Sequence, residues 1–428
     1  MRRLVSTLLA GLLLAVAPPP AVADVVPFPE SPVSGGATFS NNSMRVRALL
    51  VHGETIYAGG RFSVSQGGVT RSNLAAFDLN GNLRPEFTAA PNGPVWALAT
   101  DGVSLFVGGE FTRLELESRL AAVDLVTGAV KRDFSAHVNG VIDAEVPTGV
   151  HALEVLMDTS TEPATARLLV GGNFSQLNAA VDNRFGLGAL STDRGALDGT
   201  RFTQGVEGGY VRALLAWGTT VYVGGEFTAI QGRNASLAAL NARGTLQSGN
   251  FSTSSEPVLD LSLDEDGNRL FAAVGGLGNR VRAYTASGRS RGSSAWSGPR
   301  SGGSVNPVRG DVQTVHYFEG NVYFGFHDGM FAEPDAYKLG ALDAGTGDLE
   351  VDLDHEGLVC SNATEEETAN CWLPTLDATT GGQGFFGVWT ITDFLDPVTA
   401  ERALVVGGDF TQIGGVTRTR RMAVFRAP

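Results

Sequence analysis

The chain repeats one pattern of apolar and polar positions. A short alternating apolar segment is followed by a turn and then by a second apolar segment that ends in Gly-Gly-x-Phe. Alternation with a period of two predicts β-strands rather than helices. The motif occurs at residues 59–62, 108–111, 171–174, 224–227 and 407–410. Weaker copies lie around Ala273 and Gly325, and a unit of about fifty residues indicates a repeat architecture.

Each repeat predicts at least three strands. The first apolar segment starts with valine in seven copies, at Val46, Val95, Val150, Val211, Val258, Val312 and Val388. Turns such as Asp101-Gly102 separate it from the motif strand, and Asp-Gly is a strong hairpin signal. A third strand of the Leu-Ala-Ala type starts at Leu74, Leu120, Leu187, Leu237 and Leu339. It ends in an Asp or Asn turn, where the side chain caps the turn backbone.

A fourth, polar strand is expected to close each unit. It would lie near an aromatic residue, at Phe87, Phe134, Phe202 and Phe251. Four antiparallel strands in each of seven units predict an all-β fold, a single seven-bladed β-propeller over residues 24–428. Residues 34–41 match the fourth-strand pattern, while the last unit ends in a third strand, at 422–425. We therefore predict that the N-terminal strand completes the last blade and closes the ring.

The Gly-Gly-x-Phe motif has a packing interpretation. Glycine inside a strand marks a bulge or a close backbone approach. The phenylalanine is expected to fill the space between adjacent blades, where burying its ring stabilises by roughly 1.5–3 kcal/mol. A phosphate-binding loop is not indicated, because no helix and no Lys-Ser/Thr pair follow the glycines.

Residues 1–23 have the features of a secretory signal peptide. Arg2 and Arg3 precede a short apolar run, and the small residues 21–23 form a cleavage site before Asp24. The paired arginines raise twin-arginine export as an alternative, but the rest of that signal is missing, so Sec-type export is predicted. The expected location is secreted, periplasmic or extracellular. No other apolar run reaches membrane length, so no membrane span is expected.

The charge of the chain restricts its partners. The net charge is −14, and it becomes −16 when the two signal arginines are removed. Such acidity argues against nucleic acids and anionic membrane surfaces as partners. The 56 glycines suit an all-β chain with many tight turns. We expect a soluble monomer that needs no cofactor.

A large insertion precedes the last blade, at about residues 352–387. It holds the only two cysteines, Cys360 and Cys371. In an exported protein two cysteines at this separation predict a disulfide, more than a metal site or free thiols.

One position in the repeat carries the chemistry. The residue after the initial valine of each first strand is polar or aromatic in most copies, whereas its neighbours are small or aliphatic. These residues are Arg47, Trp96, His151, Arg212, Leu259, Gln313 and Trp389. The first strand of a blade borders the central channel, so we call this set the channel-mouth ring. Arginine and tryptophan favour binding hot spots. The alternative is that these side chains fill irregular space between blades.

Other candidate sites have weaker support. The residue before the motif phenylalanine is polar in every copy (Arg61, Glu110, Asn173, Glu226 and Asp409), but these residues belong to different blades and are expected to lie far apart. Residues 264–268 resemble a calcium loop, yet they lack its spaced acids and fall where other units have a hairpin turn. The six histidines show no metal spacing, and no Gly-x-Ser-x-Gly motif is present. We therefore predict no metal site and no catalytic residues.

The complete pattern resembles a known family. An apolar pair, Gly-Gly-x-Phe-Thr/Ser, Leu-Ala-Ala-Leu/Val-Asp and a glycine turn resemble the delta-60 repeat propellers of bacterial exported proteins. Residues 108–112 and 224–228 are the copies that match it best, and the fifth and sixth units depart from it. The resemblance implies fold and export and assigns no shared activity.

Two functions remain open on sequence alone. We favour a non-catalytic scaffold that binds a ligand or a protein. The alternative is an enzyme that acts on sugars or lactones at the channel mouth. Two arginines in the channel-mouth ring of an acidic chain favour a small anion or a sugar acid, with the tryptophan rings as flat stacking faces for a glycan.

Overall fold

The structure is a computed structural model. It describes residues 36–40, 45–159, 164–178, 185–249, 251, 256–276, 280–288, 304–305, 311–327, 339–345, 376–377, 387–398, 400, 402–413 and 421–426. Residues 1–23, Cys360 and Cys371 lie outside the described residues, so the predicted signal peptide and disulfide stay predictions.

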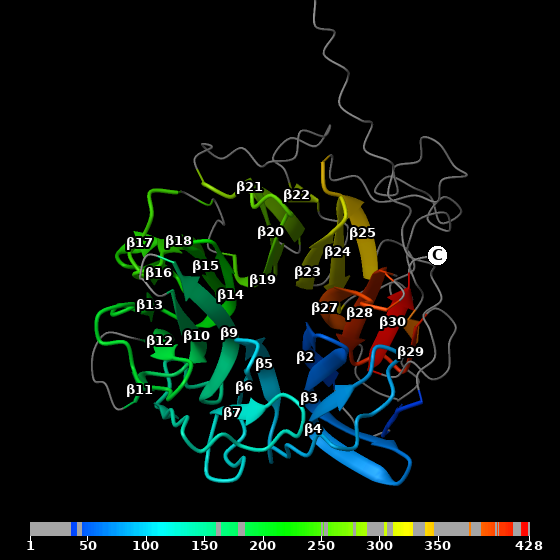
Figure 1. Cartoon of the computed structure of the whole chain (residues 1–428). Coiled ribbons are helices and arrows are strands. Elements are labelled where there is room, and N and C mark those ends of the chain that lie inside the picture. The colour runs from blue at the N-terminus through cyan, green and yellow to red at the C-terminus, as the bar shows by residue number, and fades with distance from the viewer. Residues whose placement is uncertain are drawn as a thin grey trace, which may run out of the picture.

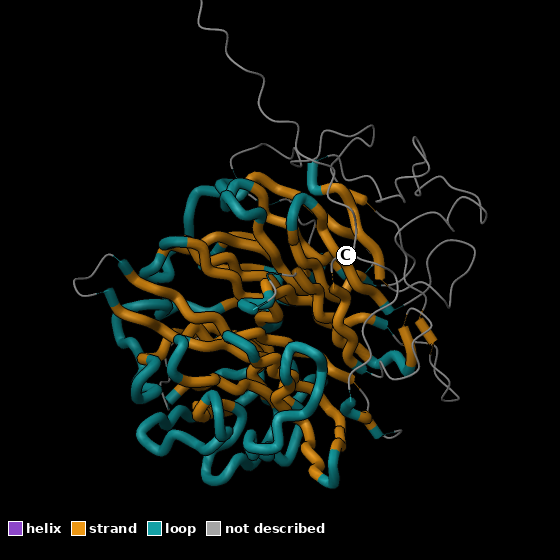
Figure 2. Tube along the Cα trace, turned by 45° about the vertical axis from the view of Figure 1, so that its right-hand side comes forward, coloured by secondary structure: helices purple, strands orange, loops and turns teal. Residues whose placement is uncertain are grey.

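The described residues form an all-β, propeller-like fold. They contain strands and loops but no helix (Figure 2). Within this part of the chain, no helix is long and apolar enough to cross a membrane. Seven sheets with the same antiparallel order, first strand to second to third, lie around a common centre (Figure 1). We number these sheets as units 1 to 7 in chain order.

The strands of each unit follow the predicted order. The first strands are β2 (Arg45–His52), β5 (Val95–Thr100), β9 (Gly149–Asp158), β14 (Val211–Trp217), β19 (Val258–Leu263), β23 (Val312–Phe318) and β27 (Val388–Leu395). The second strands are β3 (Thr55–Gln66), β6 (Ser104–Gly109), β10 (Thr165–Asn173), β15 (Thr220–Gly225), β20 (Arg269–Val274), β24 (Asn321–Phe326) and β28 (Arg402–Gly408). The third strands are β4 (Val69–Phe77), β7 (Leu120–Asp124), β12 (Leu187–Ser191), β18 (Leu237–Asn241), β21 (Arg280–Thr285), β25 (Leu339–Asp343) and β30 (Met422–Arg426).

The predicted fourth strand is wrong for units 1 to 4. There it is reduced to a single bridge beside the third strand, such as Val123 to Val130 in unit 2. The turn before it forms as expected, because the Asp124 carboxylate accepts hydrogen bonds from the backbone N–H groups of Val126 and Thr127. The chain then turns inward and buries its aromatic residue instead of extending along the sheet. These buried residues are Phe87, Phe134, Phe202 and Phe251. In unit 5, β22 (Ser304–Val305) does pair with the third strand.

Short strands brace the ends of several units. In unit 3, β8 (Val138–Asn139) precedes the first strand and pairs with β11 (Gln176–Leu177), which follows the second strand. The same arrangement recurs in units 4 and 7. It is made by β13 (Val206–Glu207) with β16 (Ala229–Ile230) and β17 (Arg233–Asn234), and by β26 (Leu376–Asp377) with β29 (Gln412–Ile413).

The predicted pairing of the N-terminal strand is also wrong. Strand β1 (Thr38–Phe39) pairs with the far end of β3 in unit 1, not with β30 in unit 7. β3 is 12 residues long and continues past the motif, so it offers an edge to which β1 can bond. The Phe39 ring packs on Phe62, with ring centroids 5.2 Å apart. Its buried cluster nevertheless includes Met422 and Val424 of unit 7. The segment therefore belongs to the buried cluster that the last and first units share, while its strand pairs with the first.

The glycines of the motif allow close approach, as predicted. A Cβ atom on the first glycine would lie 2.5–2.7 Å from Cγ1 of a valine in the next unit in six places. The pairs are Gly59 with Val95, Gly108 with Val150, Gly171 with Val211, Gly224 with Val258, Gly325 with Val388 and Gly407 with Val46. The last pair joins unit 7 to unit 1. The motif phenylalanines are buried, including Phe111, Phe174 and Phe410.

The core lies between the units rather than within them. Each of seven buried clusters combines side chains from two neighbouring units, and one of them joins unit 7 to unit 1. The first strands also contact one another in chain order, and β27 contacts β2. Face-to-face packing of sheets thus places the seven first strands around the centre of the molecule.

Candidate functional site

A β-bulge in each first strand builds the site. In unit 1, Val46 pairs with Gly60 and Ala48 pairs with Gly59, so Arg47 is left out of the ladder. The same register shift occurs in all seven units. A bulge re-aims the extra side chain and sharpens the local bend. The second glycine makes room for it, because a Cβ atom on Gly60 would lie 2.2 Å from the carbonyl oxygen of Arg45.

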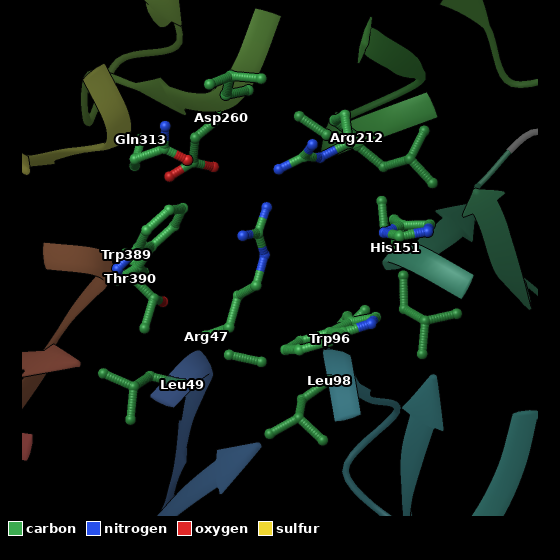
Figure 3. A pocket seen from close by; sticks show the side chains of 17 residues that line it. Arg47, Leu49, Trp96, Leu98, His151, Arg212, Asp260, Gln313, Trp389 and Thr390 are labelled. Atoms are coloured by element: carbon green, nitrogen blue, oxygen red, sulfur yellow. The ribbon is translucent and has the colours of Figure 1, made fainter. Parts of the chain in front are cut away.

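The seven bulged residues are the channel-mouth ring. They are Arg47, Trp96, His151, Arg212, Leu259, Gln313 and Trp389, and they line one cavity of about 160 Å³ (Figure 3). The structure therefore brings all the predicted ring residues together. The cavity also has lining residues that the sequence did not single out, of which Asp260 and Thr390 are polar.

Arg212 is held by an acid of its own unit. Its Nη1 donates to Glu226 Oε1 at 2.6 Å, and the Tyr210 hydroxyl donates to the same oxygen at 2.8 Å. Burial, followed by the charge of Glu226, raises the pKa of Tyr210, which keeps this hydroxyl a donor. Glu226 is the residue between Gly-Gly and Phe in the motif of unit 4. The sequence analysis did not foresee that this position pairs with a ring residue of its own unit.

Trp389 is held in the same way in unit 7. Its Nε1 donates to Asp409 Oδ1 at 3.0 Å, and Asp409 also lies 3.7 Å from Arg45. Burial raises the pKa of Asp409, whereas Arg45 lowers it. The Arg45 guanidinium stacks 3.9 Å from the centroid of Trp389, and His327 stacks on the same side chain at 5.7 Å. Arginine and histidine thus cover the indole that was expected to stack on a sugar.

Glu110 occupies the equivalent place in unit 2. Burial raises the pKa of Glu110, and the neighbouring Trp96 and Arg61 lower it. Three of the five motif positions therefore place a carboxylate beside a ring residue of the same unit. Asn173 has a structural role instead, since its amide oxygen accepts from the backbone N–H groups of Ile142 and Asp143. The bulge turns the ring residue toward the carboxylate at the motif position of its own unit. Comparing the ring position with the motif position in each repeat of the sequence could have revealed this pairing.

Arg47 differs from the other arginines of the site. Its guanidinium lies 5.1 Å from the ring centroid of Trp389 and 5.8 Å from that of Trp96. Among the residues that the structure describes, no carboxylate pairs with it. Figure 3 shows Arg47 reaching into the middle of the cavity. Desolvated cation–π contacts of this kind contribute roughly 2 kcal/mol or more.

The cavity wall across from Arg47 carries one acidic side chain, Asp260, and one uncharged polar side chain, Gln313. Asp260 Oδ2 accepts from the Thr314 hydroxyl at 2.6 Å and from the Val315 N–H at 3.2 Å. Burial raises the pKa of Asp260, and these hydrogen bonds oppose the rise. Gln313 lies beside it, and within the described chain its amide makes no hydrogen bond. Figure 3 shows both side chains across the cavity from Arg47.

His151 contributes a neutral ring to the cavity. Burial lowers the pKa of His151 to about 4, so the imidazole is uncharged at neutral pH. Its ring centroid lies 5.3 Å from that of Tyr210. His151 therefore adds an aromatic surface without adding positive charge.

Side chains further along the first strands, beyond the bulges, connect neighbouring units. Glu154 accepts from the Ala216 N–H of the next unit at 3.3 Å, and His316 Nε2 lies 2.6 Å from Asp393 Oδ1. Glu154 keeps some exposed surface, but protein surrounds its carboxylate and burial raises its pKa to about 7. These contacts have a structural explanation as links between strands.

Residues 264–268 form a hairpin turn between β19 and β20, where the Asp264 carboxylate accepts from the N–H groups of Asn268 and Arg269. In the described ranges, no group of three His, Cys, Asp or Glu side chains is placed to hold a metal ion.

The chain was compared with known proteins in three ways. No family model matches it, and no curated protein matches it. Among solved structures, it is similar to Sqt1 from Saccharomyces cerevisiae, a WD40 β-propeller-like protein, at 11% sequence identity and a TM-score of 0.50. That match covers 92% of this chain and 100% of the other. The computationally designed Ika8 protein matches at 13% identity and a TM-score of 0.45, covering 92% of this chain and 99% of that one. The similarity to Sqt1 supports the propeller-like fold alone.

Proposed function

We propose that this protein is an exported, non-catalytic binding scaffold built on a seven-bladed β-propeller. One observation carries the proposal: seven β-bulges, one in each unit, converge on a single cavity. Structural packing alone does not require a bulge residue that differs in chemistry from unit to unit. A rigid ring that presents different side chains at equivalent places suits ligand recognition.

The ring closure is part of this proposal. It is supported by the valine of unit 1 against the glycine of unit 7, by the buried cluster shared between those units, and by the contact of β27 with β2. Arg426 of unit 7 also donates to the Leu79 carbonyl and to Asn80 in unit 1, both at 3.0 Å. The proposed likeness to delta-60 repeat propellers rests on the repeated Gly-Gly-x-Phe motif. In this chain the first glycine of the motif lets the valine of the next unit pack closely.

Export and ligand class rest on the sequence. The apolar segment within residues 1–23, the net charge of −14 and a Cys360–Cys371 disulfide suit a secreted or periplasmic protein. The ligand is a glycan, a small anion or a protein, and nucleic acid is disfavoured by the acidic charge.

An enzyme acting on sugars or lactones is the alternative. The feature that favours it is Asp260, an acid with a raised pKa on the cavity wall. Hydrolysis of a lactone panel by the wild-type protein, lost in Asp260→Asn, would establish the enzyme. Binding without turnover supports the scaffold.

A screen with a blocked cavity tests the proposed function. The exported chain is applied to a glycan array and a small-molecule panel, together with Leu259→Trp, which fills the cavity from unit 5. Trp217→Ala is the control, because Trp217 lies at a hairpin tip and is 46% exposed. We expect Leu259→Trp to lose binding and Trp217→Ala to keep it. Equal binding by wild type and Leu259→Trp would place the ligand elsewhere and refute the proposal.

A further inference from the structure

Resting on the proposed binding function, we infer that the cavity binds a small hydroxy monocarboxylic acid, with its carboxylate on Arg47 and its hydroxyl on the Gln313 side.

The pairing of the arginines selects Arg47 as the anion-binding group. Arg212 is bonded to Glu226 at 2.6 Å, and Arg45 is paired with Asp409 at 3.7 Å. Within the described ranges, Arg47 has only the faces of Trp96 and Trp389. A guanidinium without a carboxylate in a partly desolvated cavity is a site for an anion that the protein does not itself supply.

The geometry of Arg47 favours a carboxylate. Its planar group lies near two indole rings, and the side chain ends in the cavity (Figure 3). A guanidinium fork matches a planar carboxylate with two parallel hydrogen bonds. Asp260 on the cavity wall and Glu110 beside Trp96 disfavour a more highly charged anion such as a phosphate dianion.

The covered tryptophan argues against a sugar stacked on the ring. Arg45 lies 3.9 Å from the centroid of Trp389, and His327 is stacked nearly parallel to it, at 11°. A pyranose would have to displace one of them. The glycan expectation therefore does not extend to this part of the cavity.

The polar side chains across from Arg47 and the volume of the cavity indicate the hydroxyl and the size of the ligand. Gln313 and Asp260 lie across from Arg47 and offer hydrogen-bonding groups to a hydroxyl. The cavity of about 160 Å³ is close to an engineered cavity of about 150 Å³ that holds one benzene molecule. An acid of about six non-hydrogen atoms fits this space.

Isothermal titration with four matched probes tests the inference. Lactate carries the acid and the hydroxyl, propionate lacks the hydroxyl, glycerol lacks the acid, and inorganic phosphate carries more charge. We expect lactate to bind most tightly, propionate more weakly, and glycerol and phosphate weakest. Arg47→Gln should weaken lactate about 10- to 100-fold, as expected for a lost charge-assisted hydrogen bond.

Three further variants sharpen the result. Arg61 is an exposed arginine of the same unit that does not line the cavity, so the Arg61→Gln variant should bind lactate like wild type. Arg47→Lys keeps the charge but loses the planar fork, so its loss should be intermediate. Gln313→Leu should weaken lactate and leave propionate unchanged. Unaltered circular dichroism and melting of each variant show that it is folded.

Several results would overturn the inference. These are no binding of either acid, phosphate binding more tightly than lactate, or lactate affinity that is unchanged in Arg47→Gln. A glycan or protein that binds wild type but not Leu259→Trp, while neither acid binds, would refute the hydroxy acid and still support the proposed scaffold. Failure of the proposed function is instead marked by a ligand that binds Leu259→Trp and wild type equally.

Discussion

The contact between unit 7 and unit 1 gives the sharpest test of the architecture. A Cβ atom added at Gly407 would lie 2.7 Å from Val46 Cγ1 and 2.7 Å from Thr390 Cγ2. Val46 is fully buried, so its side chain has no open space into which it can move. Gly407→Ala is therefore expected to force the two units apart. The equivalent contact inside the ring, between Gly224 and Val258, is 2.6 Å.

The expected magnitude follows from overpacking. Inserting a methyl group into a well-packed core costs about 1–3 kcal/mol. Replacing glycine stiffens the unfolded chain and returns about 0.4–1 kcal/mol. Gly407→Ala should therefore lower the free energy of unfolding by about 1–2 kcal/mol. Gly199→Ala is the control, since no atom lies within 4 Å of its added Cβ, and it should be neutral or slightly stabilising.

Double-mutant cycles isolate the contact itself. Gly407→Ala is combined with Val46→Ala, and Gly224→Ala with Val258→Ala, and each free energy of unfolding is measured by denaturant titration. Shortening the valine relieves part of the clash. The loss of unfolding free energy in each double mutant should therefore be about 1 kcal/mol smaller than the sum of the losses in its two single mutants. Similar coupling in both cycles is the expected result. Coupling at Gly224 with none at Gly407 would show that the last unit does not pack on the first, and the closed ring would be wrong.

Three further predictions concern stability. Burial raises the pKa of Glu154 from 4.5 to about 7, so the wild type loses stability as pH rises through that interval. In denaturant titrations, the free energy of unfolding of Glu154→Gln should match that of wild type near pH 4 and exceed it by about 3 kcal/mol near pH 8. Free energies of unfolding that change in parallel with pH would contradict this. Asp158 is fully buried and paired with Arg201, so Arg201→Met should cost about 3–5 kcal/mol in the same assay, and a neutral effect would contradict the pairing. Phe39→Ala should cost about 3–5 kcal/mol because its ring is buried against Phe62 and Phe77, and an unchanged melting temperature would refute that packing.

Much of the fold could be predicted because the repeat is a pattern of packing. Six of the seven first strands carry, at or next to their first residue, a valine that meets a glycine of the neighbouring unit. This constraint appears in the sequence as Val and Gly-Gly at similar spacing. β21 was missed, although the alternating residues Val281 and Ala283 carry its signal. The partner of β1 could not be predicted, because it depends on how far β3 continues beyond its motif.

The sequence predicted the ring residues of the candidate site but not the residues that pair with them. The channel-mouth ring stood out by its chemistry at one repeat position. The pairing of Arg212 with Glu226 and of Trp389 with Asp409 was not predicted, since it depends on the bulge that turns one residue of each first strand. Asp260 was missed because the equivalent residue is alanine in units 1 to 4 and only its place beside Thr314 gives it a role.

A crystal structure of the protein with its tightest ligand from the glycan and acid screens tests the central claim most directly. The account predicts that the ligand lies in the central cavity and contacts bulged residues from at least three units, with Arg47 among them. A ligand bound at the hairpin tips or in a groove between two units, with only water in the cavity, would contradict it.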